Sequence, residues 1–502
     1  MPVFSLKIIL VSLVGASMVC AFAPFCYWWL TFICPAVLYS TISNQTVRTA
    51  SLLDFLFGLF FFGFGVPWTF NSIHEFGHAP LFLSAVLAGL LVIILSLFPA
   101  CVAGLMVYLQ PQKHFELYSA ITFACLWVVF EWIRGWIFTG FPWLLVGHVH
   151  HTGPLQGVLP VFGSYGASWV TILLGSFLSI VLFAKVKQKI IASIAISVIA
   201  ISLYVANQIT WTSAEDEALE VALVQGNISQ EMKWDRSKHS FIMEKYLEMS
   251  KRHFDADIIV WPETAIPTYY SLVKDSFIQK VGQTAFENNL DYLIGVFTYD
   301  SEENRVYNSV MTLGSELGFY QKQHLVPFGE YLPFRGIFTF LDRYIDLPMA
   351  DISSGEGRPL VRLKGHPVGA SICYEAVYGN EVIQAMPEAK FLVNVSNDAW
   401  FGDSLAPHQH LEITRSRAVE TGRFMLRATN TGISAVIDPK GRILNKSVQF
   451  EDDVVRATIS PYNGVTPYAR WGNWGIICII CSFLAGILIL RRLTVNRNMH
   501  TN

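Results

Sequence analysis

Ser371-Ile372-Cys373-Tyr374-Glu375 places a thiol directly after an apolar run, His366 to Ile372, that reads as a buried strand. A thiol at a strand end, with carboxylates elsewhere in the chain, is a common way to build a nucleophile. The other cysteines all lie in long apolar runs: Cys20, Cys26, Cys34, Cys101, Cys125, Cys478 and Cys481. Cys373 therefore has no disulfide partner in the polar part of the chain. Most free cysteines are only small buried hydrophobes, so the rest of the chain decides whether Cys373 is a nucleophile.

The composition is that of a membrane protein. Of the 502 residues, 53% are hydrophobic and only 15% are charged, whereas a soluble domain carries about 25% charged residues. The formal net charge of −3 says nothing about nucleic acid, and no basic run suggests a nucleic-acid partner. Most charged residues lie between Glu215 and Arg470. The sequence thus predicts a polar domain held between membrane segments.

Eight apolar runs are candidate membrane spans, because a span needs ~20 apolar residues. They are Leu6–Ala21, Tyr27–Ile42, Leu52–Phe70, Pro80–Leu109, Leu117–Ile133, Tyr165–Ala184, Ile190–Gln208 and Trp474–Leu490. The first run resembles a cleaved signal peptide, but the second follows it at once, which favours an uncleaved anchor.

The basic residues between these runs indicate the orientation. They fall in alternate segments, at Lys7, Arg48, Lys113, Lys185 to Lys189, and Arg491-Arg492. Such segments face the cytoplasm, so both termini are expected inside and residues 210–470 outside. The predicted organisation is a membrane domain of seven helices (1–209), an extracytoplasmic domain (210–470), and an eighth helix with a cytoplasmic tail (471–502).

Residues 210–470 alternate between strand-like and helix-like runs, which predicts one layered α/β domain. The strand-like runs are Leu219–Val224, Asp257–Trp261, Tyr292–Thr298, Val306–Leu313, Val368–Ile372, Phe391–Val395 and Gly432–Ile437. The helix-like runs are Lys238–His253, Lys274–Asn288 and Gln409–Thr421, the last ended by Gly422.

Two further sites in this domain carry chemistry. Glu263 follows an apolar strand and Pro262, where desolvation suits a carboxylate to take a proton from a thiol. Lys322 ends another strand-like run, and a lysine beside a reacting carbonyl stabilises an oxyanion. The plain alternatives are a carboxylate at a helix N-terminus and a surface lysine.

Glu263, Lys322 and Cys373, in this order and each after a strand, resemble the Glu-Lys-Cys triad of the nitrilase superfamily. Further motifs are Gln225-Gly226-Asn227-Ile228 with Trp234, Glu131 to Gly135, Thr139 to Trp143, Val326 to Pro333, and Asn394 to Phe401. With these motifs, and with eight spans around such a domain, the whole chain resembles the bacterial apolipoprotein N-acyltransferase family.

The resemblance implies a nitrilase-like αββα sandwich inserted before the last helix of an eight-helix transmembrane domain. It implies that Cys373 is the nucleophile, Glu263 the general base and Lys322 the oxyanion donor. Supporting or substrate-binding roles fall on matching positions, namely Glu330, Trp234, Tyr374 and Glu375. The implied reaction moves an acyl chain from a phospholipid, through a cysteine thioester, to the N-terminal diacylglyceryl-cysteine of an apolipoprotein. The expected enzyme is a monomer in the bacterial inner membrane, with a periplasmic catalytic domain and no metal or cofactor.

Two other interpretations remain open. A membrane-tethered amidase would act on a small soluble amide, and a transporter or scaffold would only bind; the transporter is disfavoured because few charges, chiefly Glu131 and Arg134, lie in the spans. The apolar segment Phe334 to Phe340 favours a lipid substrate and is expected to be a lipid-facing lid.

Two groups of histidines are candidate metal ligands. His74-Glu75-Phe76-Gly77-His78 fits a zinc motif, and His148, His150 and His151 could add ligands. The zinc motif needs both histidines on one face of a helix. Gly77 and Pro80 predict a loop instead, so no metal site is expected here.

Overall fold

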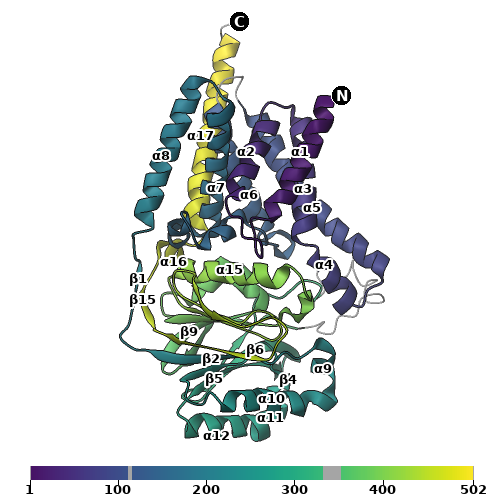
Figure 1. The fold of residues 1–502 in the computed structure, drawn as a ribbon, viewed down its shortest axis with the longest axis vertical. Coiled ribbons are helices and arrows are strands. Elements are labelled where there is room, and N and C mark those ends of the chain that lie inside the picture. The colour runs from purple at the N-terminus through teal and green to yellow at the C-terminus, as the bar shows by residue number, and fades with distance from the viewer. Residues whose placement is uncertain (1, 111–115, 332–351, 501–502) are drawn as a thin grey trace. The chain divides into compact units, whose positions relative to one another are not determined.

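The computed structural model describes residues 2–110, 116–331 and 352–500, and the chain divides into two compact units (Figure 1). The first unit comprises residues 1–70, 85–209 and 471–502, and the second comprises residues 71–84 and 210–470. The segment 71–84, which the sequence placed with the membrane domain, thus packs with the second unit. The predicted lid, Phe334 to Phe340, lies outside the described residues.

The first unit is helical, as its apolar runs predict. Its long helices in the described part of the chain are α1 (Pro2–Val19), α2 (Leu30–Ile42), α3 (Val47–Gly65), α5 (Leu81–Leu109), α6 (Glu116–Arg134), α7 (Leu159–Phe183), α8 (Val186–Ala206) and α17 (Trp474–His500). Five helices, namely α3, α5, α6, α7 and α8, are long and apolar enough to cross a membrane. The apolar parts of α1, α2 and α17 are shorter. A membrane protein is therefore confirmed, while eight spans remain a prediction.

The buried charged side chains of this unit form hydrogen bonds with backbone groups and with other side chains. Glu131 accepts hydrogen bonds from Trp127 Nε1 (3.0 Å) and from the Val146 N–H (3.1 Å). Arg134 donates to carbonyls of the loop after α6, including that of Trp143 at 2.6 Å. A further ionisable side chain, Asp54 on α3, is also fully buried, beside the backbone of Ala103, so the few such groups in the spans extend beyond Glu131 and Arg134.

The second unit contains two large sheets. The seven-stranded sheet runs β14-β2-β3-β5-β6-β7, with β4 paired to β5. Its strands are β2 (Leu219–Gln225), β3 (Ile258–Val260), β4 (Ile266–Tyr269), β5 (Asp291–Asp300), β6 (Arg305–Leu313), β7 (Gly318–Gln321) and β14 (Asp453–Ile459). The six-stranded sheet runs β13-β12-β11-β10-β9-β8. Its strands are β8 (Leu360–Leu363), β9 (His366–Ile372), β10 (Phe391–Ser396), β11 (Met425–Thr429), β12 (Ala435–Ile437) and β13 (Ile443–Lys446). A separate antiparallel pair joins β1 (Thr212–Ala214) to β15 (Tyr462–Gly464).

Helices cover the outer faces of the two sheets (Figure 1). The seven-stranded sheet is covered by α10 (His239–Lys251), α11 (Tyr270–Val273) and α12 (Gln279–Glu287), and the six-stranded sheet by α14 (Gly379–Val382) and α15 (Ala406–Thr421). Three further short α-helices lie in the described part of the chain, namely α4 (Trp68–Asn71), α9 (Gln230–Trp234) and α16 (Pro467–Trp471). Gly422 ends α15 with a left-handed φ of +62°, as its sequence predicts.

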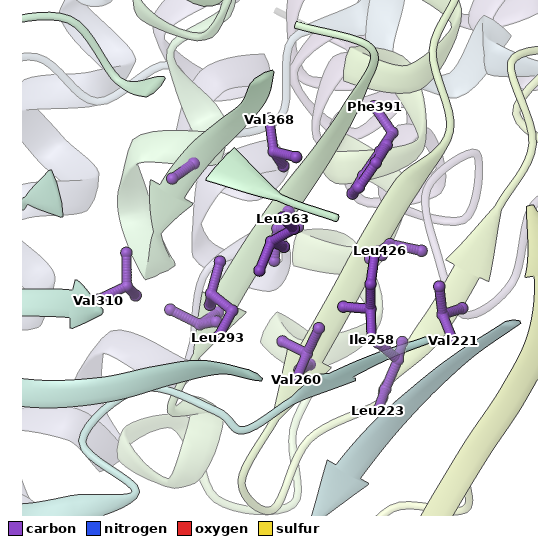
Figure 2. Close-up of a cluster of buried hydrophobic side chains, with 14 of the residues drawn as sticks. Val221, Leu223, Ile258, Val260, Leu293, Val310, Leu363, Val368, Phe391 and Leu426 are labelled. Carbon is purple, nitrogen blue, oxygen red and sulfur yellow. The ribbon is translucent and has the colours of Figure 1, made fainter. Parts of the chain in front are cut away.

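The layers follow from the two-residue period of the strands. Val221 and Leu223 of β2 point into the core between the sheets, where they join Leu426 (Figure 2). Ala222 and Val224, between and beyond them, pack in the outer cluster with α10. Because successive side chains of a strand alternate between faces, these strands are buried on both sides. The result is the predicted αββα sandwich.

Several neighbouring strands in each large sheet are parallel, so their carboxyl ends lie at the same edge. β9 and β10 are parallel, and so are β2, β3 and β5. The carboxyl ends of parallel strands meet at one edge of a sheet, where open α/β folds place ligands. Cys373 directly follows β9. Glu263 lies three residues beyond the end of β3, and Asp398 lies two residues beyond the end of β10.

Candidate active site

Cys373 directly follows β9 and begins a tight 3-10 turn that runs to Val377. Its φ is +52°, a left-handed conformation that costs a non-glycine residue ~1 to 2 kcal/mol. The side chain of Glu375 stabilises the turn, because it accepts the N–H of Ile372 at 2.7 Å. The same carboxylate accepts the Tyr320 hydroxyl (2.7 Å), so the turn is tied to the end of β7 in the other sheet.

Glu263 lies after β3 and Pro262 and is only 5% exposed. The next residue, Thr264, is left-handed with φ +50°. This turn passes so close to β5 that a Cβ at Gly295 would lie 2.3 Å from the Pro262 carbonyl. Only glycine at position 295 leaves room for the backbone of Pro262 to Thr264, which carries the Glu263 side chain, to pass this close to β5.

Lys322 directly follows β7 and lies between two carboxylates. Its Nζ is 2.9 Å from Glu330 Oε1 and 3.7 Å from Glu263 Oε1. Asn308 on β6 joins the same oxygens, because its Nδ2 donates to Glu263 at 2.7 Å and to Glu330 at 3.3 Å. Glu330 is itself held by the Val326 N–H (2.8 Å). The cluster thus fixes a buried cation against two acids.

The electrostatics of the cluster follow from this geometry. Burial alone would lower the pKa of Lys322, but the carboxylates of Glu330 and Glu263 raise it above its ordinary value. Lys322 is therefore a permanent cation. Burial and the nearby Glu263 carboxylate raise the pKa of Cys373 to about 12, against the opposing charge of Lys322. At neutral pH the Cys373 side chain is therefore an uncharged thiol.

A second buried lysine was not anticipated from the sequence. Lys233 on α9 is fully buried, and its Nζ donates to the Glu263 carbonyl (3.1 Å) and to Thr264 Oγ1 (2.6 Å). Burial lowers the pKa of Lys233 to about 8, although the charges of Glu263 and Cys373 oppose the shift. Asn308 was also missed. An asparagine in the middle of an apolar strand is disfavoured, and that is the signal that could have found it.

The remaining candidate residues surround the cluster. Trp234 ends α9, with its ring 6.1 Å from that of Phe297. Its indole Nε1 is buried, and no residue in the described part of the chain accepts its hydrogen. Tyr374 is 8% exposed and packs edge-on against Tyr378, with ring centroids 5.2 Å apart.

Comparison with known proteins gives the family. The carbon-nitrogen hydrolase model matches residues 220–467, and the apolipoprotein N-acyltransferase N-terminal domain model matches residues 14–177. The chain is 39% identical to the apolipoprotein N-acyltransferase of Methylococcus capsulatus, over 97% of each protein. It is 38% identical to that of Coxiella burnetii, over 95% of this chain and 98% of the relative. The chain belongs to the apolipoprotein N-acyltransferase family. The resemblance inferred from the motifs is thereby confirmed.

The structure also describes the histidines of the sequence His74-Glu75-Phe76-Gly77-His78. The π-helical turn that contains His74 ends at Phe76, and His78 is left-handed with φ +50°. His74 Nδ1 is bonded to the Ala79 carbonyl at 2.8 Å. The two histidines therefore do not share a helical face as the zinc motif requires. Elsewhere in the described ranges, Glu215, Glu217 and His366 lie close enough together to bind a metal ion. However, Glu215 already accepts a hydrogen bond from Lys390, and Glu217 is paired with His366.

Proposed function

We propose that this enzyme transfers a fatty acyl chain from a membrane phospholipid to the α-amino group of the N-terminal S-diacylglyceryl-cysteine of an apolipoprotein. One observation carries the proposal: Cys373, Glu263 and Lys322 belong to one buried electrostatic cluster, in a chain of the apolipoprotein N-acyltransferase family. No metal or cofactor takes part, since the three side chains supply a nucleophile, a base and an electrophilic cation.

In the first half-reaction, Glu263 takes the proton of the Cys373 thiol. The sulfur attacks the ester carbonyl of the phospholipid, and Lys322, together with the N–H of Tyr374, stabilises the oxyanion. The intermediate collapses, the C–O bond breaks, and Glu263 returns the proton to the leaving lysophospholipid. With a thiol pKa of about 12, free thiolate at pH 7 would cost ~7 kcal/mol. Proton transfer to Glu263 therefore accompanies attack, and the cation of Lys322 acts when negative charge develops.

In the second half-reaction, the free amine of the acceptor attacks the thioester and gains the acyl chain as an amide. Glu263 takes a proton from the attacking nitrogen, and Cys373 leaves as the thiol. A covalent intermediate divides one difficult ester-to-amide transfer into two easier steps. It also lets two large lipid substrates use one site in turn, which predicts ping-pong kinetics.

The surrounding residues have supporting roles in this scheme. Glu330 holds Lys322 in place through the 2.9 Å contact, and Glu375 holds the nucleophile turn. Trp234 and Tyr374 contact substrate. The unpartnered indole N–H of Trp234 supports this role, because a buried donor without a partner is costly unless a ligand accepts its hydrogen.

The enzyme is proposed to act from the bacterial inner membrane as a monomer, with eight spans, cytoplasmic termini and the catalytic unit on the periplasmic side. The alternation of basic loops supports this orientation. A reporter that is active only in the cytoplasm should be silent when fused after Trp211. Activity at that position would overturn the proposed topology.

The direct test uses purified full-length enzyme and a phospholipid vesicle. Intact-mass analysis should show an acyl adduct on Cys373, and a diacylglyceryl lipopeptide should then remove it as the amide. Cys373→Ala should do neither. Amide formation by Cys373→Ala would overturn the mechanism, whereas hydrolysis of a small soluble amide without any adduct from phospholipid would indicate the tethered amidase instead.

A further inference from the structure

The backbone carbonyl of Cys373 is held by two buried side chains. His410 on α15 places Nε2 3.2 Å from this oxygen. Asn394 on β10 places Nδ2 3.4 Å from it. Both residues are at most 1% exposed. The nucleophile is therefore tied to the neighbouring strand and to the helix that covers its sheet.

A buried ionic cluster stands behind these two side chains. Arg427 on β11 lies 2.7 Å from Asp398 Oδ2 and 3.1 Å from His410 Nδ1. Its other terminal nitrogen donates to Asn394 Oδ1. Replacing buried ion pairs by apolar groups is often neutral or stabilising in proteins. Stability alone therefore does not account for a cluster placed behind the nucleophile.

The chemistry of the contacts fixes the proton on the ring. A carbonyl oxygen only accepts, so His410 Nε2 must carry hydrogen when it bonds Cys373. Burial, and then the charge of Arg427, lower the pKa of His410, so the ring is neutral near pH 7. Its Nδ1 then accepts from Arg427. If the ring gains a second proton, Nδ1 can donate to Asp398 at 3.1 Å while Nε2 keeps its hydrogen.

Holding this carbonyl has a consequence on the other side of the peptide bond. The peptide unit is planar and trans, so its C=O and the following N–H point in opposite directions. A fixed Cys373 carbonyl thus fixes the direction of the Tyr374 N–H. It also restrains Cys373 in its left-handed conformation, φ +52°, which the backbone would otherwise tend to leave.

We infer that His410 is a positioning residue for the nucleophile: its Nε2–H, together with the amide of Asn394, clamps the Cys373 carbonyl and so aims the thiol and the Tyr374 N–H at the substrate carbonyl. The inference rests on the proposed role of Cys373 as the acylated residue.

The test is a matched pair of amide variants. A glutamine amide reaches the position of histidine Nε2, whereas the shorter asparagine amide reaches only that of Nδ1. His410→Gln keeps a donor for the Cys373 carbonyl, and His410→Asn keeps only a partner for Arg427 or Asp398. The rate of thioester formation is measured by quenched-flow mass analysis of full-length enzyme in phospholipid vesicles. His410→Asn should lose at least about tenfold in the maximal rate, as small misplacements of reacting groups do. His410→Gln should stay within about threefold of the wild type, with the same half-saturating phospholipid concentration in both variants.

The melting temperatures of the two variants provide the control. Both variants remove the imidazole, so a purely structural role predicts equal losses of rate and of melting temperature. Equal rates for Gln and Asn would overturn the inference. A wild-type enzyme that forms no adduct would instead contradict the proposed function itself.

If neither His410 variant folds, Asn394→Asp tests the same carbonyl. This near-isosteric change keeps an oxygen for Arg427 but removes the donor that faces Cys373. Thioester formation should again fall by about tenfold or more if the clamp operates. An unchanged rate in Asn394→Asp would overturn the inference.

Discussion

The protonation state of Cys373 can be measured with a small alkylating reagent. With the pKa of Cys373 raised to about 12, about 10⁻⁴ of the thiol is ionised at pH 8, against about a quarter for an ordinary cysteine. A more basic thiolate is a better nucleophile, which recovers about 1.6 of these ~3.4 logarithmic units. The net expectation is that Cys373 is alkylated about a hundredfold more slowly than the same residue in the denatured chain.

Two variants that remove a charge should change the alkylation rate of Cys373 in opposite directions. Glu263 raises the pKa of Cys373 and Lys322 lowers it. Glu263→Gln should therefore speed alkylation, by about threefold for each unit that the pKa falls, although it abolishes thioester formation from phospholipid. Lys322→Met should slow alkylation further. A general loosening of the site would change the alkylation rate of both variants in the same direction. It therefore does not predict faster alkylation in Glu263→Gln together with slower alkylation in Lys322→Met.

The assay follows iodoacetamide labelling of the Cys373 peptide by mass spectrometry, because seven other cysteines are present. Labelling of urea-denatured protein gives the intrinsic rate, and melting temperatures show whether the variants remain folded. Slower labelling of folded Glu263→Gln would refute the reasoning, since it would mean that Glu263 already ionises the thiol in the resting enzyme.

Three further changes test the neighbouring charges. Lys322→Ala should slow thioester formation by ~10²-fold or more, the usual loss for an oxyanion donor, and an unchanged single-turnover rate would contradict that role. Glu375→Gln should cost ~1 to 3 kcal/mol of stability in thermal or urea unfolding, because its NH₂ group would leave a buried donor such as Ile372 N–H unsatisfied; equal stability would mean that the turn does not need the carboxylate. Burial lowers the pKa of Lys233 to about 8, so the unfolded chain binds more protons between about pH 8 and pH 10.4. Wild-type stability should therefore rise relative to Lys233→Met over this range, and a flat difference would refute the low pKa.

The sequence was informative where the chemistry is local. The strands before Glu263 and Cys373 are continuous apolar runs because they are buried on both faces, and such runs are easily recognised. The order of the three residues along the chain indicated the superfamily, and the apolar spans with the further motifs then indicated the family. The helix from Ala406 to Thr421 was found within a few residues, because Gly422 marks its end.

What the sequence did not reveal depends on long-range packing. The strand β11 follows α15 directly and carries Arg427, whose charge hides a buried strand from any hydrophobic pattern. The strand β14 pairs with β2 across more than two hundred residues, and no local signal indicates that partner. Asp54 was overlooked inside an apolar helix for the same reason, since burial of a single carboxyl depends on which helix packs against it.

The turns at Cys373 and Glu263 are held in the same way. Cys373 and Thr264, the latter next to Glu263, both adopt left-handed backbone that a non-glycine residue avoids. In each turn a fully buried side chain holds a carbonyl: His410 binds that of Cys373 (3.2 Å), and Lys233 binds that of Glu263 (3.1 Å). Strained turns persist only when their surroundings over-determine them. In the proposed mechanism, this support lets the base Glu263 and the thiol of Cys373, on opposing sheets, keep one relative geometry through both half-reactions, while two different lipid substrates enter and leave.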